Sequence, residues 1–241
     1  MKRILGLLFV FVGLMCTMVF ADTDDSRWKE YASSDAKRYY WDVQTLKYDA
    51  ATNKALLWTK ATWKYNNPSE KYLPGDLPET ELYQITIDFN TKEEQEVQYV
   101  YYFKNGISEL KQSNQPPYFI YPDSSPERLA DEVADRIGIP HLFQNLSPRW
   151  KWVKSTDTHS IYILNQAPAY DGNSKSYKVH CKMIWPNAYH KVGFNSYDCN
   201  FDEGTIKSYI NGKYIYHIPI PDTEEEAIYN AAYALFKENQ K

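Results

Sequence analysis

The most regular feature of the chain is an alternation of apolar and polar side chains. It is clearest over residues 176–185, where an apolar face alternates with Ser176, Lys178, His180 and Lys182. This face is formed by Tyr177, Val179, Cys181, Met183 and Trp185. Residues 97–103 alternate in the same way. Successive side chains of a strand point to opposite faces, so this period of two predicts strands with one face in a core. Asn105-Gly106 and Asn211-Gly212 lie between strand-like runs and predict hairpin turns, because a type I′ turn needs positive φ at both central residues.

The spacing of the apolar residues changes from a period of two to that of a helix after residues 124 and 223. Ser124-Ser125-Pro126-Glu127 and Thr223-Glu224-Glu225-Glu226 both fit a capping box, the signature of a helix start. Apolar residues then recur with helical spacing, at Leu129, Val133 and Ile137 and at Ile228, Ala231, Ala232, Leu235 and Phe236. The spacing predicts a helix with one buried face after each group of strands. Gly138 is expected to end the first helix.

The chain contains an internal repeat. Residues 27–63 align with residues 149–185 at a constant offset of 122 without a gap, and eleven of the 37 positions are identical. The identical pairs include Trp28 with Trp150, Tyr40 with Tyr162, and Lys60 with Lys182. Farther on, Asp88-Phe89-Asn90 matches Asp198-Cys199-Asn200, and Pro122-Asp123-Ser124 matches Pro221-Asp222-Thr223. Two copies are too few for a solenoid, so each copy needs a core of its own.

These patterns predict how the chain is organised. Residues 1–21 are expected to be a signal peptide, residues 22–138 a first domain, residues 139–147 a linker, and residues 148–241 a second domain. Each domain is expected to be a roughly six-stranded antiparallel sheet with a C-terminal helix packed on one face. The fold class is therefore α+β, made twice in tandem.

The N-terminus predicts export. Lys2 and Arg3 precede an apolar stretch from Ile4 to Phe20, and Val19-Phe20-Ala21 ends it with residues suited to cleavage. An uncleaved membrane anchor is the alternative, but these 17 residues are fewer than the roughly 20 that a spanning helix needs. We expect a periplasmic, cell-surface or secreted protein with no integral membrane segment after cleavage.

The charge of the mature chain limits its partners. Removing Lys2 and Arg3 leaves 25 basic residues against 31 acidic ones, a net charge of −6. An acidic chain of this kind is not expected to bind nucleic acid or an anionic membrane surface as its main partner.

The order of these motifs resembles the bacterial surface-adhesin protein E family. The shared features are an opening Trp, a Tyr-rich strand, a strand that ends in Trp, Asp-[Phe/Cys]-Asn, a Tyr strand leading to Asn-Gly, and Pro-Asp-[Ser/Thr] before a terminal helix. The resemblance covers nearly all of both copies and implies a single antiparallel sheet of about six strands with a helix across one face. The founding member is a surface lipoprotein that binds host matrix proteins, so the resemblance implies adhesion. The chain lacks that family's lipobox and its cysteine at the helix end, and no binding residues carry over.

No enzyme active site is evident, and neither a metal nor a cofactor is expected. The histidines, at His141, His159, His180, His190 and His217, show no metal-ligand spacing. His180-Cys181 would place a base and a nucleophile on opposite faces of a strand. Neither a Gly-x-Ser-x-Gly turn nor a glycine-rich phosphate loop is present. We expect no catalytic residues. A secreted hydrolase stays open as an alternative because carboxylates are plentiful, but nothing in the sequence singles out a pair of them.

The two mature cysteines, Cys181 and Cys199, are candidates for a disulfide. Export places a chain where disulfides persist, and both residues fall on the apolar phase of successive strands. Antiparallel pairing of those strands would bring the thiols into reach of each other. The alternative is two buried free thiols that pack as small apolar side chains.

Tyrosine is unusually frequent, with 22 residues in the chain. Some of these rings must lie on the second face of a small sheet, where an exposed aromatic surface usually marks a partner site. The alternative for any one ring is that the terminal helix covers it. We therefore expect a binding protein whose partner is a protein, such as a host matrix protein, or else a glycan or another small ligand.

Overall fold

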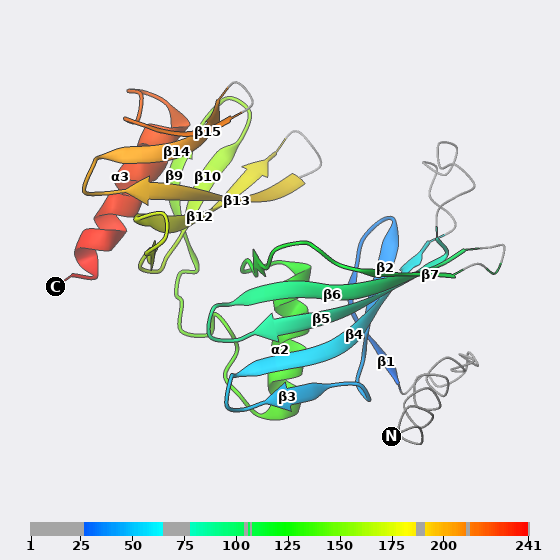
Figure 1. The fold of residues 1–241 in the computed structure, drawn as a ribbon. Helices are drawn as coiled ribbons and strands as arrows, with labels where there is room; N and C mark the ends of the chain where they lie inside the picture. Colours follow the sequence, from blue (N-terminus) through cyan, green and yellow to red (C-terminus); the bar gives the residue numbers. More distant parts are fainter. Residues whose placement is uncertain are drawn as a thin grey trace, which may run out of the picture. The chain divides into compact units, whose positions relative to one another are not determined.

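The computed structural model describes residues 27–64, 78–103, 106, 108–186, 191–210 and 213–240 (Figure 1). The predicted signal peptide, Asn105 of the first predicted turn and the whole Asn211-Gly212 turn lie outside the described residues. The described residues form two largely antiparallel sheets and two helices, which confirms the α+β class. Neither described helix is long and apolar enough to cross a membrane.

The elements follow the same order in both repeats. The first repeat contains β1 (Trp28–Ser33), β2 (Lys37–Asp42), β3 (Lys47–Asp49), β4 (Lys54–Trp63), β5 (Thr80–Asp88), β6 (Glu93–Tyr102), β7 (Ser108–Gln112), β8 (Tyr118–Phe119) and α2 (Ser125–Ile137). The second contains β9 (Trp150–Ser155), β10 (Ser160–Leu164), β11 (Ala169–Asp171), β12 (Ser176–Trp185), β13 (Lys191–Asn200), β14 (Thr205–Ile210), β15 (Lys213–His217) and α3 (Glu224–Glu238).

The two sheets have the same topology. The first runs β1-β2-β4-β5-β6-β7, with β3 paired to β4 and β8 paired to β6. The second runs β9-β10-β12-β13-β14-β15, with β11 paired to β12. Strand for strand, β9 to β15 therefore repeat β1 to β7, as a duplicated sequence predicts. Each sheet has the expected path of six strands, to which the short side strands are added.

The pairing of neighbouring strands confirms a hairpin at both predicted places, whereas the type of each turn stays a prediction. Tyr102 lies opposite Ser108 where β6 turns into β7. Ile210 lies opposite Lys213 where β14 turns into β15, which leaves two residues for the connection. Gly106 has a φ of +78°, a conformation that glycine adopts without strain.

The described residues divide into two compact units by their contacts. One unit contains the described residues up to 47 together with Leu56–Ile85 and Val97–Ser113, and the other contains Tyr48–Ala55, Thr86–Glu96 and the described residues from 114 onwards. The division crosses β4, β5 and β6. The domain boundaries expected from the sequence, at residues 138 and 148, stay a prediction.

Helix α3 packs on the second sheet through the apolar face that the sequence predicts. Ile228, Ala232 and Leu235 are buried on this face. They join a core formed by Ile161, Ile163, Val179, Cys181, Cys199 and Ile206 from the strands. The alternation of β12 thus directs its apolar positions towards the helix, as expected for a sheet with one face in the core.

Both helices begin at the predicted capping boxes. In α2 the Glu127 N–H donates to Ser124 Oγ (3.3 Å), and Glu127 Oε2 accepts from the Asp123 N–H (2.7 Å). In α3 the Glu226 N–H donates to Thr223 Oγ1 in the same way (3.2 Å). Gly138, at a φ of +74°, ends α2 as predicted and donates to the Ala134 carbonyl.

Candidate binding surfaces on the second sheet

The face of the second sheet opposite α3 carries the aromatic and charged positions of its strands. Successive strand residues alternate between faces, so the side chains on either side of each core residue belong to this outer face. They are Lys178, His180 and Lys182 on β12, Phe194, Ser196 and Asp198 on β13, Lys207 on β14, and Tyr214 and Tyr216 on β15. This face divides into a covered part and an exposed part.

The covered part lies under residues 119–124, which are the end of β8 and its connection to α2. Phe119 stacks on the His180 ring, with ring centroids 3.6 Å apart and planes 7° apart. Tyr121 stacks on Phe194 at 4.8 Å, and its hydroxyl hydrogen-bonds Ser196 Oγ at 2.7 Å. All of these residues belong to the second compact unit. For these rings, the cover is therefore this connecting segment and not a terminal helix.

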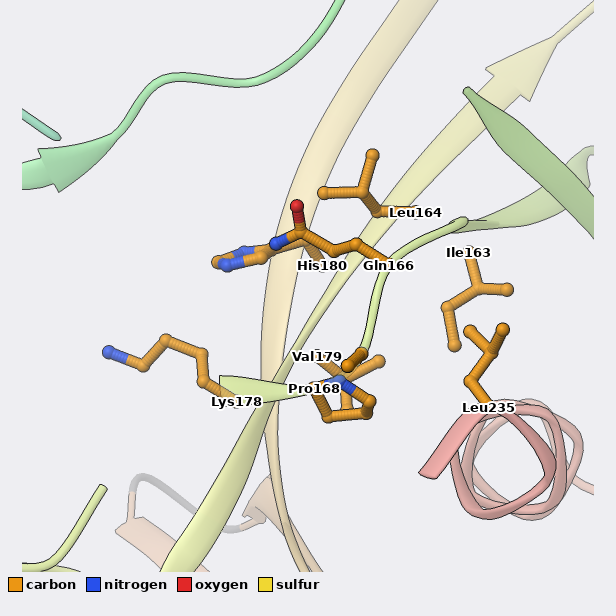
Figure 2. A pocket seen from close by; sticks show the side chains of 9 residues that line it. Ile163, Leu164, Gln166, Pro168, Lys178, Val179, His180 and Leu235 are labelled. Atoms are coloured by element: carbon orange, nitrogen blue, oxygen red, sulfur yellow. The ribbon is translucent and has the colours of Figure 1, made fainter. Parts of the chain in front are cut away.

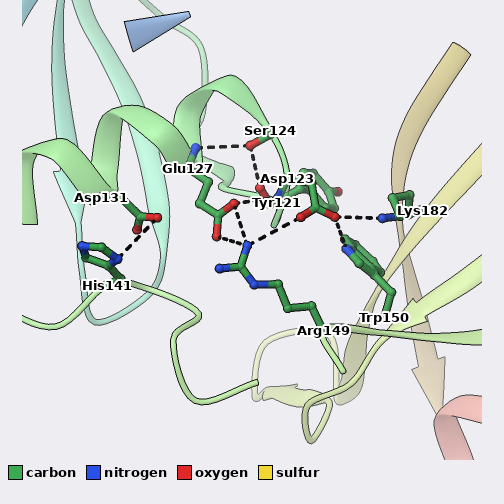
Figure 3. A network of polar contacts seen from close by, with 9 residues as sticks. All are labelled: Tyr121, Asp123, Ser124, Glu127, Asp131, His141, Arg149, Trp150 and Lys182. Carbon is green, nitrogen blue, oxygen red and sulfur yellow. Dashed lines mark hydrogen bonds and ion pairs between the residues drawn. The ribbon is translucent and has the colours of Figure 1, made fainter. Parts of the chain in front are cut away.

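A polar network continues this contact at the start of α2 (Figure 3). Asp123 accepts hydrogen bonds from Lys182 Nζ (2.8 Å) and from Trp150 Nε1 (2.9 Å). Arg149 forms an ion pair with Glu127 (2.8 Å) and lies 3.5 Å from Asp123. Desolvation acts to raise the pKa of Asp123, but the bonds from Lys182 and Trp150 and the charge of Arg149 outweigh it, and the pKa is lowered. Asp123 is thus an ionised anchor for this network.

Three of the residues that are identical in the two repeats, a Trp, a Tyr and a Lys, form the same cluster in both sheets. Lys182 Nζ lies 4.8 Å from the centroid of Trp150 and 5.9 Å from that of Tyr162. In the first sheet, Lys60 Nζ lies 4.6 Å from Trp28 and 5.1 Å from Tyr40. A cation over the face of an aromatic ring is attracted by the ring quadrupole. We call each set a Trp-Tyr-Lys cluster, and it explains why these three positions match between the copies.

The exposed part of the outer face is a tyrosine patch, formed by Tyr214, Tyr216, Lys207 and Asp198. Tyr214 is 70% exposed and Tyr216 is 39% exposed. Lys207 Nζ lies 5.5 Å and 5.8 Å from the two ring centroids, and it forms an ion pair with Asp198 at 3.0 Å. The patch places two aromatic faces beside a paired cation and anion at the edge of the sheet.

A small pocket opens between the loop after β10, strand β12 and helix α3 (Figure 2). Ile163 and Leu235 line it on the side of the helix, while Lys178 points away from them. Its space is sufficient for about one water molecule, which is too little for a sugar or a cofactor. The pocket therefore contributes no ligand site.

One contact between a hydroxyl and a histidine has the form of a nucleophile and its base. Ser196 Oγ lies 2.8 Å from His180 Nδ1. Burial lowers the pKa of His180 to about 3, and the charges of Lys178 and Lys92 act in the same direction. A group with this pKa is a weak general base near neutral pH, and Phe119 covers its ring. Sequence reasoning missed this contact because Ser196 and His180 are on different strands. Among the described residues, no cluster of His, Cys, Asp and Glu could hold a metal ion.

The strand register corrects the candidate disulfide. Cys199 lies opposite Tyr177 and Cys181 lies opposite Asn195, so four residues of β12 separate the two cysteines. That separation is about 13 Å along a strand, whereas a disulfide needs Cα atoms within about 7 Å. Both cysteines are free and buried in the core. Burial raises the pKa of Cys199 to about 12 and raises that of Cys181 further, so both are unreactive thiols.

We expect two free thiols per mature chain. Titration after unfolding without a reductant should detect both, and titration of the folded protein should detect neither within the time of the assay, because no thiolate is exposed. A single-cysteine variant, Cys199→Ser, provides the calibration of one thiol. If the unfolded, unreduced chain showed no free thiol, Cys181 and Cys199 would form a disulfide after all.

The chain was compared with known proteins. No family model matches it, and no curated protein matches it at a significant level. The resemblance to the protein E family therefore stays a prediction from short motifs.

Proposed function

We propose that the chain is an exported binding protein of the cell envelope or surface, and that it binds another protein through the outer face of its second sheet. A host matrix protein is the partner that the motif resemblance suggests. The observation that carries the proposal is the tyrosine patch, because aromatic residues beside a polar rim are enriched where proteins meet. Tyr214 and Tyr216 supply contact area with few rotatable bonds, and the Lys207–Asp198 pair supplies polar groups next to them.

One more exposed ring lies on the same face, at the other edge of the sheet. Trp152 on β9 pairs with Tyr162 and is 63% exposed. Ile215 on β15, which is 42% exposed, points to the opposite face from Tyr214 and Tyr216. Strand β15 is an edge of the sheet, and an edge is where an extended segment of a partner can add a strand. The corresponding edge in the first repeat, β7, carries the ion pair between Glu109 and Lys111, the kind of charge that protects an edge. This difference favours the second sheet as the binding sheet.

Exchanging both tyrosines should weaken partner binding. We expect the double variant Tyr214→Ser, Tyr216→Ser to lose about tenfold or more in affinity for a matrix protein captured in a pull-down, as is typical of aromatic residues central to an interface. Surface plasmon resonance against the captured protein gives the measurement. The matched control is Tyr170→Ser, which removes another exposed tyrosine, on β11. Equal binding by the double variant and the parent would contradict the patch.

A carbohydrate-binding module is the second candidate function. The tyrosine patch favours it because two aromatic faces beside a charged pair offer both stacking and hydrogen bonds to a sugar. A glycan array probed with the mature protein separates the two candidates. Glycan binding that the double tyrosine variant loses, without capture of any matrix protein, would select the sugar.

We further propose that the isolated protein is not an enzyme. The support is the nature of the hydroxyl–histidine contact, in which the histidine is buried, stacked and weakly basic. A secreted hydrolase would instead show turnover of ester or glycoside substrates, and loss of that turnover in Ser196→Ala would overturn this proposal.

A further inference from the structure

The segment that follows α2 turns back over the helix directly after its end. Gly138 has a φ of +74°, and the N–H groups of Gly138 and Ile139 both donate to the Ala134 carbonyl, at 2.8 Å and 3.0 Å. A glycine in the left-handed conformation reverses the chain at a helix end in this way. His141, three residues beyond Gly138, is thereby brought back beside the last turns of α2.

The helix face that His141 meets carries two aspartates. Asp131 and Asp135 are four residues apart on α2, so their side chains lie on one face, about one turn from each other. His141 Nε2 lies 2.8 Å from Asp135 Oδ1. Nδ1 of the same ring lies 3.7 Å from Asp131 Oδ2 (Figure 3). Each ring nitrogen therefore faces a carboxylate.

Only the protonated ring suits both carboxylates. A neutral imidazole has one N–H and one lone pair, whereas the imidazolium has an N–H on each nitrogen. A carboxylate is an acceptor only, so it attracts an N–H and repels a lone pair. When His141 loses its proton, one of its two contacts with α2 therefore changes from attraction to repulsion.

The charged groups around His141 favour the protonated ring. The hydrogen bond to Asp135 raises the pKa of His141, and the charges of Asp131, Asp135 and Glu127, all on α2, raise it further against a smaller effect of desolvation. Arg149 pairs with Glu127 and acts on Asp131. Because the folded pKa lies above the ordinary value of 6.5, the contact stabilises the fold below pH 6.5. This stabilisation is lost as the pH rises through the raised pKa.

The same segment packs against the residues that cover the second sheet. Phe143, two residues after His141, is 1% exposed, and its ring centroid lies 6.0 Å from that of Phe119. Lys92 Nζ lies 4.7 Å from the centroid of Phe143. Phe119 in turn stacks on His180. The burial of Phe143 keeps the segment in place at any pH, so His141 can change how tightly the segment is held, but not whether it is docked.

We propose that His141 is a pH-sensitive clamp, which tightens residues 139–146 onto α2 through Asp131 and Asp135 when it is protonated and loosens them when it is neutral. The clamp acts at the expected junction between the two repeats. It responds to pH values just above 6.5, a range that an exported protein meets in its surroundings. This inference goes beyond the proposed function and does not depend on it, since the tyrosine patch contains none of these residues.

Hydrogen exchange of the mature chain at pH 6 and at pH 9 tests the proposal. Each measured rate is divided into the rate of the unstructured chain at the same pH, which gives a protection factor. The protection of residues 139–146 should fall by about two- to fivefold between pH 6 and pH 9, the range that ion pairs near the surface supply. Amides of β12 report global unfolding. A fall in the segment that only follows these amides, or no fall at all, would overturn the proposal.

Two substitutions at the same position separate the charge from the shape of the side chain. His141→Gln cannot be protonated, so its segment should have the lower protection at both pH values. His141→Lys keeps a cation throughout this range, so its segment should have the higher protection at both. His217→Gln, which changes a histidine of β15, is the matched control and should behave like the parent. A segment in His141→Gln that loses protection from pH 6 to pH 9 as the parent does would overturn the clamp.

Discussion

Replacing Glu94 with glutamine is expected to stabilise the protein by about 3 kcal/mol at pH 8 and to change its stability little below pH 4.5. Glu94 lies on β6 and is 8% exposed. Desolvation raises the pKa of its carboxyl from 4.5 to about 7, although the hydroxyl of Tyr118 donates to it and opposes the rise. The folded chain therefore binds a proton that the unfolded chain releases above pH 4.5. Native stability falls as the pH rises from 4.5 through 7, and a neutral amide avoids this loss.

Chemical denaturation at a series of pH values measures the effect. The difference in unfolding free energy between Glu94→Gln and the parent should grow from near zero at pH 4 to its full size at pH 8. Glu203→Gln, an exposed position, is the matched control and should show no such trend. A difference that is the same at every pH would mean that Glu94 is not protonated in the folded state.

Replacing His180 with phenylalanine should protect the protein against acid. The pKa of His180 is lowered to about 3 by burial and by the charges of Lys178 and Lys92. Below pH 6.5 the unfolded chain binds a proton at His180, whereas the folded chain stays neutral there until the pH approaches 3. The free energy of unfolding therefore decreases as the pH falls from 6.5 towards 3. The cost reaches about 3 kcal/mol at pH 4.5, at roughly 1.4 kcal/mol per pH unit. Phenylalanine keeps the stack on Phe119 and removes the titrating group.

The comparison of His180→Phe with the parent should therefore change with pH. The variant should be close to the parent at pH 7 and more stable by about 3 kcal/mol at pH 4.5 in the same denaturation experiment. His141→Gln should show the opposite sign, because the hydrogen bond to Asp135 raises the pKa of His141 and the resulting stability is present at low pH. No gain for His180→Phe on acidification would contradict a buried neutral imidazole.

The helices could be predicted from the sequence because their determinants are local. The capping residues Ser124 and Thr223 contact backbone groups three residues away, and the apolar face of α3 follows from spacing alone. The shared topology of the two sheets could be inferred, because two copies of one sequence are expected to fold alike. The hairpin after β14 followed from a two-residue turn signal.

The features that the sequence did not predict depend on register and on distant contacts. Whether Cys181 meets Cys199 depends on the point at which the chain reverses, and pairing of Trp185 with Lys191 places Asn195, not Cys199, opposite Cys181. The stack of Phe119 on His180 joins residues 61 positions apart. Neither residue stands in a pattern that marks it, so no local signal could have found the covered surface.

The position of α3 at the end of the chain affects the order in which the second core can be completed. A ribosome or an exporter delivers a chain from its N-terminus, and strands β9 to β15 all precede α3. Until Ile228, Ala232 and Leu235 have emerged, the core side of this sheet, including Ile161 and Ile206, has no cover from the helix. The nascent sheet is then open to aggregation. A premature stop codon between β15 and α3, after His217 and before Glu224, would thus leave a complete second sheet without its helix, prone to capture by chaperones or proteases.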